Sequence, residues 1–217
     1  MTRWIQAREI FWQRGRFCCT MSPVQMPRQL KTLDELLAQA EHYANYCMCG
    51  TGRVTPALFL IGGDALHMFV PQSLAADGAK DDFAATARLL CMAHAASACV
   101  MTLEAWAKFA KPGEKFDMTE APSEAFDRRE FVVLMGESRD GLKHKFLPII
   151  RSGNGKFFGF GESEDPGADE MKGRFAQILP TKVPDDGLRE VAKAMLKAKG
   201  VKVAQPGNAP RLPRGRR

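Results

Sequence analysis

The chain has 217 residues, 45% of them hydrophobic, which is enough for one core of ordinary size and leaves little room for two full domains. The longest relevant apolar run, residues 57–61, excludes a transmembrane helix, which needs about 20 apolar residues. No apolar signal-peptide core stands near the N-terminus either, so the expected localisation is cytoplasmic.

The net charge of +6 is distributed very unevenly along the chain. Residues 1–31 carry six Lys or Arg against one acid, and residues 193–217 carry eight against none. The body between them has a net charge of −7. A nucleic-acid-binding domain normally carries its positive charge on the folded surface. We therefore expect only weak, non-specific binding of nucleic acid, through the two basic ends.

Residues 1–29 are predicted to be a basic, loosely ordered leader. Its arginines alternate with apolar residues that include Trp4 and Trp12, so a basic amphipathic segment on a membrane surface is the open alternative. The single folded domain is predicted to span residues 30–200. Residues 201–217 are rich in Pro, Gly and Arg, and they are predicted to form a disordered basic tail.

The domain is predicted to open with a helix. Thr32 and Glu35 have the spacing of a capping box, in which each side chain binds a free N–H at the helix start. Helical spacing of apolar residues continues to about residue 46, and Gly50 and Gly52 end the helix. Two short apolar runs, residues 57–61 and 66–70, are separated by Gly-Gly-Asp and predict a hairpin.

A second helix is predicted over about residues 79–96. Its inward stripe consists of Phe83, Thr86, Ala87, Leu90, Cys91 and His94. Three or four strands are expected next, over residues 98–109, 130–137, 143–150 and 156–161. The dipeptides Asp140-Gly141 and Asn154-Gly155 predict type I′ turns between them. Pro148 cannot donate to a ladder, so it predicts a bulge or an edge.

A last helix is predicted to start at Asp185 and Asp186 and to end at Gly200. One face of it is expected to carry Leu188, Val191, Ala192, Met195 and Leu196. The order is then α-β-β-α-β-β-β(-β)-α, which predicts an α+β fold with one antiparallel sheet of five or six strands covered by helices. This order resembles the profilin-like and roadblock-like arrangement, whose members usually bind partners or small ligands.

No metal and no cofactor are expected. Cys47 and Cys49 lack the further paired cysteines or histidines that a zinc site needs, and Cys18 and Cys19 are directly adjacent. Cys91 and Cys99 lie in apolar contexts and are predicted to be buried as small hydrophobic residues. No phosphate-binding glycine loop and no catalytic triad order is present in the sequence.

Four charged residues form the candidate polar cluster: Glu104, Arg128, Arg129 and Glu137. Both carboxylates stand beside apolar strand segments, where an unpaired charge would be costly to bury. Antiparallel neighbouring strands would bring Arg129 near Glu104 and leave Glu137 at the other end. The cluster is either a structural ion-pair network or a general acid–base site.

The segment from Gly52 to about Pro180 resembles a family of uncharacterised bacterial proteins. The shared motifs are Glu104-Ala105-Trp106 and Pro122-Ser123-Glu124 followed by Asp127-Arg128-Arg129-Glu130. The resemblance supports one domain and implies no activity.

Three hypotheses for the function follow from the sequence. The leading one is a non-enzymatic binding or regulatory module for an unknown protein or small ligand, acting through the end of the sheet or the helix faces. The second is a small enzyme with a carboxylate and arginine site around Glu104 and Arg129. The third is a weak accessory binder of nucleic acid.

Overall fold

The computed structural model describes residues 5–6, 31–63, 65–71, 74, 76–107, 128–164 and 174–201. The helices are α1 (Leu33–Thr51), α2 (Asp77–Ala93) and α3 (Asp186–Ala198). The strands are β1 (Ile5–Gln6), β2 (Ala57–Gly62), β3 (Ala65–Val70), β4 (Ala98–Ala107), β5 (Arg129–Ser138), β6 (Gly141–Arg151) and β7 (Phe157–Phe160).

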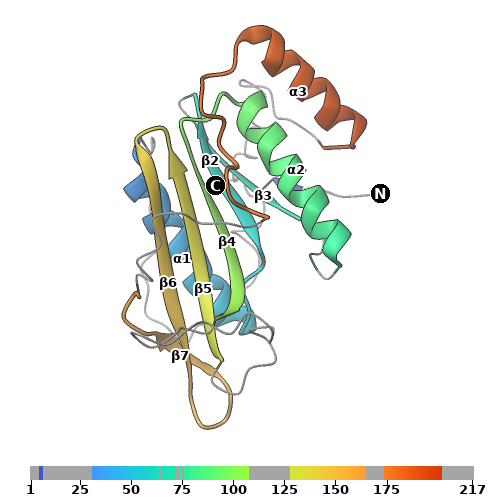
Figure 1. The fold of residues 1–217 in the computed structure, drawn as a ribbon. Coiled ribbons are helices and arrows are strands. Elements are labelled where there is room, and N and C mark those ends of the chain that lie inside the picture. The colour runs from blue at the N-terminus through green and yellow to red at the C-terminus, as the bar shows by residue number, and fades with distance from the viewer. Residues whose placement is uncertain are drawn as a thin grey trace, which may run out of the picture.

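All strands belong to one antiparallel sheet with the order β1-β3-β2-β4-β5-β6-β7. Helix α1 covers one face of this sheet and α2 covers the other, while α3 lies beside one end of α2 (Figure 1). The predicted α+β class, the single antiparallel sheet and the order of the elements are therefore confirmed. The two-residue β1 is the one strand that the sequence did not predict.

The sheet separates two hydrophobic cores. On the α1 side, Leu36, Ala40 and Met48 pack against alternate residues of β2, β4 and β5. On the α2 side, Phe83 and Leu90 pack against the intervening residues of the same three strands, which point to the opposite face. Strand β2 is buried along its whole length because both of its faces are covered, which is why its sequence is a continuous apolar run.

Helix α1 begins as predicted. The amide of Glu35 donates to Thr32 Oγ1 over 3.2 Å, and the amide of Thr32 donates to Glu35 Oε2 over 3.1 Å. The helix continues to Thr51, five residues further than predicted, and Gly52 ends it with a φ of 72°. Glycine adopts this left-handed conformation without the steric cost that a Cβ brings. The extension places Cys47 and Cys49 in the last turns of the helix.

Both predicted hairpin turns lie where the sequence placed them, but their type is different. A type I′ turn needs positive φ at both central residues, and neither Asp140 nor Asn154 has it. Ser138 at the end of β5 pairs with Gly141 at the start of β6, and the two residues between them form the turn. The positive φ values belong to Gly141 and Gly155, the residues that follow the turns.

Pro148 lies inside the sheet, so the predicted edge position is wrong. Strand β6 pairs with β5 on one side and with β7 on the other. The carbonyl of Pro148 accepts from the amide of Gly161, so its ring nitrogen faces the same side, at the end of β7. The ladder with β5 therefore loses no donor. The other predicted alternative, a bulge at Pro148, is not found at that residue, since the register shift in this strand lies between Ile150 and Arg151.

The boundaries of the folded unit differ slightly from the prediction. The backbone of Ile5 and Gln6 pairs with Val70 and Phe69, although the sequence placed these residues in the leader. Val201 was assigned to the tail, but it is buried and its amide donates to the carbonyl of Leu196. The remainder of the predicted leader and residues 202–217 lie outside the described residues.

Gly62, the last residue of β2, has no room for a side chain. A Cβ at this position would lie 2.7 Å from the Cβ of His94 and 2.9 Å from its carbonyl oxygen. We expect Gly62→Ala to lower the free energy of unfolding by about 2 kcal/mol, because overpacking forces the backbone to shift. Urea unfolding followed by circular dichroism measures this.

Gly50 provides the matched control. It lies inside α1, and a Cβ there would meet no atom within 4 Å. Gly50→Ala should leave stability unchanged or raise it by up to about 1 kcal/mol, since alanine is the better helix former. Equal stabilities for Gly62→Ala and the wild type would show that the end of β2 and His94 pack loosely enough to admit a methyl group.

Candidate functional site

The register of β4 and β5 shows how the predicted polar cluster is divided. Glu104 pairs with Val132, and Ala107 pairs with Arg129. Successive residues of a strand point to opposite faces of the sheet. Glu104 is on the α1 face with Val132, while Arg129 and Glu137 are on the α2 face with Phe131. The predicted pairing of Arg129 with Glu104 is therefore wrong.

The two glutamates of the cluster do not share a site. Glu137 pairs with Cys99, five positions along β4 from Glu104. That is roughly 17 Å at about 3.4 Å per residue, with the sheet between the two side chains. This separation along antiparallel strands agrees with the geometry expected from the sequence.

Arg128 and Arg129 lie where β5 begins, next to the part of β4 that carries Glu104. The two arginine side chains are on different faces of the sheet. Arg129 forms a two-pronged ion pair with Glu164, in which both N–O distances are 2.7 Å. Because the side chains of Arg129 and Glu164 are 49% and 35% exposed, such a pair contributes at most about 1 kcal/mol. The guanidinium of Arg128 lies 4.8 Å from the centre of the Trp106 ring.

Glu137 is buried and binds a distant part of the backbone. Its carboxylate accepts from the amides of Ile178, over 3.1 Å, and Leu179, over 2.7 Å. Arg88 of α2 donates to three carbonyl groups of the same segment, those of Arg174, Ala176 and Gln177. We call residues 174–180 the strap. Glu137 and Arg88 bind the strap to the α2 side of the molecule, which is a structural role.

Glu104 lies among other polar groups at the C-terminal end of α1. Its Oε1 accepts from the amide of Val54 over 2.6 Å. Burial raises the pKa of this carboxyl, the hydrogen bond from Val54 lowers it, and the nearby charge of Glu130 raises it further. Glu130 in turn forms a two-pronged ion pair with Arg151, with both N–O distances 2.8 Å. The structure thus brings Glu104 together with Glu130 and Arg151, which the sequence analysis did not pair.

These groups are engaged with one another and with the backbone. The hydroxyl of Tyr43 donates to the carbonyl of Thr55 over 2.9 Å, and Arg151 also approaches the carbonyl of Gly52. Burial raises the pKa of the neighbouring Cys47 thiol, which keeps it in the less nucleophilic, protonated form. A half-buried carboxyl with a raised pKa can act as a general acid. Here the arrangement connects the end of α1 to the sheet.

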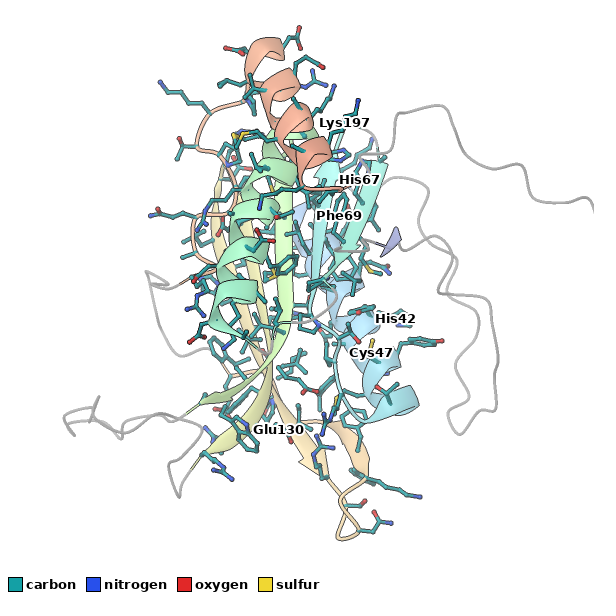
Figure 2. All side chains as sticks on the ribbon, turned by 90° about the vertical axis from the view of Figure 1, so that its right-hand side faces the viewer. His42, Cys47, His67, Phe69, Glu130 and Lys197 are labelled. Atoms are coloured by element: carbon teal, nitrogen blue, oxygen red, sulfur yellow. The ribbon has the colours of Figure 1, made fainter. Side chains whose placement is uncertain are left out.

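A second polar group lies at the other end of the molecule, where two histidines are in contact. The rings of His67 and His94 have centroids 4.1 Å apart, and Phe69 lies 5.8 Å from His94. Figure 2 shows His67 and Phe69 of β3 towards the same end of the molecule as Lys197 of α3, with Cys47 and Glu130 far away along the molecule. Burial lowers the pKa of His94 to about 4, with further contributions from His67, Lys193 and Arg189.

The described residues contain neither a metal-binding cluster nor a membrane-spanning helix. No group of three or more His, Cys, Asp or Glu side chains in that part of the chain is arranged to hold a metal ion. None of the helices described there combines the length and the hydropathy needed to cross a bilayer. Cys91 and Cys99 are buried, as predicted.

Helix α3 carries an apolar face that remains exposed among the residues that the structure describes. The sequence predicted one face with five apolar residues, but only Ala192 and Leu196 are buried. Leu188, Val191 and Met195 are 53%, 57% and 49% exposed. Their spacing of three and four residues places them on one side of the helix, and the exposed Ala194 and Ala198 extend that side. We call the set Leu188, Val191, Ala194, Met195 and Ala198 the α3 stripe.

Comparison with known proteins adds no relative. No family model matches the chain, and neither a curated protein nor a solved structure matches it. The resemblance to a bacterial family and the profilin-like and roadblock-like arrangement therefore stay predictions.

Proposed function

We propose that this chain is a non-enzymatic cytosolic binding module and that it docks an amphipathic helix of a partner protein on the α3 stripe. The observation that supports the proposal is the exposure of Leu188, Val191 and Met195 side by side on one helix. Exposed apolar residues are ordinary when they are scattered, whereas contiguous ones mark interaction surfaces.

The shape of the stripe favours a helical partner. Large residues alternate along it with Ala194 and Ala198, so ridges and hollows succeed one another as helix packing requires. It contains no aromatic residue of the kind that anchors an interfacial helix in a lipid surface.

The distribution of charge along α3 favours one orientation of the partner helix. The N-terminal end of α3 has the acids Asp185, Asp186 and Glu190 against the one base Arg189, and the C-terminal end has Lys193, Lys197 and Lys199. Protein helices commonly carry acids in the first turn and bases in the last, because these complement the helix dipole. Such a helix matches α3 in charge when it runs antiparallel to it.

The enzyme hypothesis has less support. Glu104 and Arg129 are on opposite faces of the sheet, and the carboxylates of Glu104, Glu130 and Glu137 all bind amides or an arginine. The nucleic-acid hypothesis depends on charge in residues that mostly lie outside the described ones.

Site-specific photocrosslinking tests the proposed function. A photoreactive amino acid at position 191 should give an adduct with one defined protein, mapped to an amphipathic helix of that protein. The control position is Asp186, which helical periodicity places on the opposite side of α3 and which should give no such adduct. Equal adducts from both positions, or adducts only with lipid or nucleic acid, would contradict the proposal.

A further inference from the structure

We infer that the helix docked on the α3 stripe is α3 of a second copy of this chain, paired antiparallel about a two-fold axis that passes near Val191. This inference rests on the proposed function and names the partner of the same surface. A two-fold interface uses the same patch on both copies, so the patch has to be complementary to itself.

The spacing of large and small residues in α3 meets this requirement. In an antiparallel pair centred on Val191, residues equally far before and after it in sequence lie at the same height along the two helices. Leu188 then lies level with Ala194 of the second copy, and Met195 lies level with Gly187 of the second copy. Both small residues are exposed. Each long side chain therefore meets a hollow, as in ridges-into-grooves packing.

The charges on α3 favour the antiparallel orientation over the parallel one. Two parallel copies would place their acidic ends together and their lysines together. Antiparallel copies place Lys197 of one copy level with Asp185 of the other, and they oppose the two helix dipoles. These charges flank the stripe at a distance, so salt screens their effect, and they select direction more than they add affinity.

The size of the helix sets the expected strength. A helix of 13 residues is about 20 Å long, so one face per copy buries far less than the roughly 1,600 Å² of a standard interface. Association should therefore be weak, with a Kd on the order of 100 µM. It has to be measured at high protein concentration.

Sedimentation equilibrium of the full chain from about 10 µM to 1 mM tests the inference directly, since this range spans the expected Kd. The weight-average mass should rise from the 24.0 kDa monomer towards twice that value. Leu188→Lys and Met195→Glu should each weaken association at least tenfold. Their unchanged circular dichroism and Tm would show that the fold is intact.

Two controls make the test specific. Val183 is 64% exposed and lies outside α3, so Val183→Lys removes an exposed apolar residue without touching the stripe and should leave association unchanged. In a mixture, the Leu188→Lys chain should associate with the Ala194→Glu chain at least tenfold more tightly than either variant associates with itself. The reason is that the new opposite charges lie level with each other.

The outcomes separate the inference from the proposed function. A monomer at 1 mM, or a dimer that Leu188→Lys and Met195→Glu leave intact, would overturn the self-pairing. If position 191 still crosslinks to a helix of a different protein, the docking surface remains and only its assigned partner is wrong. A mixture that stays as weak as its separate components would overturn the register about Val191.

Discussion

Replacing Glu137 with alanine should lower the free energy of unfolding by about 3–5 kcal/mol. The carboxylate binds the amides of Ile178 and Leu179 in a buried setting. Each buried amide left without an acceptor costs about 1–3 kcal/mol. The apolar side chains of the two strap residues also pack in the α2-side core, so detachment of the strap would add to the loss. Whole domains have only about 5–15 kcal/mol of stability.

Urea unfolding of Glu137→Ala measures the effect, and Glu137→Gln refines it. Glutamine keeps one carbonyl acceptor, so it should lose less than alanine does. Glu190→Ala is the control, since Glu190 is exposed on α3 and forms a surface ion pair with the neighbouring Lys193. That substitution should change stability by less than about 0.5 kcal/mol. A loss below about 1 kcal/mol for Glu137→Ala would mean that the strap is held by other contacts.

Acid should destabilise the protein through His94. Burial holds its pKa at about 4 in the folded state, against 6.5 for an ordinary histidine. Above pH 6.5 the group is neutral in both states and contributes nothing. As the pH falls from 6.5 to 4, the unfolded chain takes up the proton first, so stability decreases. At about 1.4 kcal/mol for each pKa unit, the loss is on the order of 3 kcal/mol.

The groups around His94 explain why protonation of its ring is unfavourable in the folded state. His67 of β3 is in ring contact, and Arg189 and Lys193 of α3 are close enough to act on the ring. Its Nε2 is buried and has no hydrogen-bond partner among the described residues. The free energy of unfolding, measured with urea between pH 4 and 7, should depend less on pH in His94→Asn than in the wild type. This variant keeps a polar residue at the end of α2. The same dependence on pH in the variant and the wild type would remove His94 as its cause.

The fold was largely predictable because its signals are local. The capping box of Thr32 and Glu35 lies within four residues, and the glycines that follow the hairpin turns are adjacent to the strands they join. Strand and helix periods show directly in the spacing of apolar residues. The type of a turn depends on backbone angles that a dipeptide alone does not determine, and this explains the error at Asp140 and Asn154.

The site was less predictable because it depends on register and on distant partners. The opposite faces of Glu104 and Arg129 follow only once β4 and β5 are aligned. Glu137 finds its donors about 40 residues further along the chain, and Arg88 finds its acceptors more than 80 residues away. Glu130 is adjacent in sequence to the predicted cluster. Its partner Arg151 belongs to the next strand, β6, and no motif in the sequence connects the two residues.

The α3 stripe shows a limit of hydrophobic periodicity. Leu188 and Ala192 are four residues apart, as are Val191 and Met195, and all four fit one broad apolar face. The sequence cannot show that α2 covers only the side with Ala192 and Leu196. A broad apolar face on a short terminal helix can therefore indicate two contact surfaces, one inside the fold and one outside it.

The short strand β7 has a consequence for solubility. Strand β6, with eleven residues, is the longest of the sheet, and without β7 it would present a long row of unpaired backbone groups. Such an edge is a template for aggregation. The four residues of β7 and the bridge from Glu164 to Phe146 occupy one half of that row, and Lys143 and Lys145 place charges along the other half. A small, irregular strand thus protects the largest one from pairing with its neighbours in a concentrated solution.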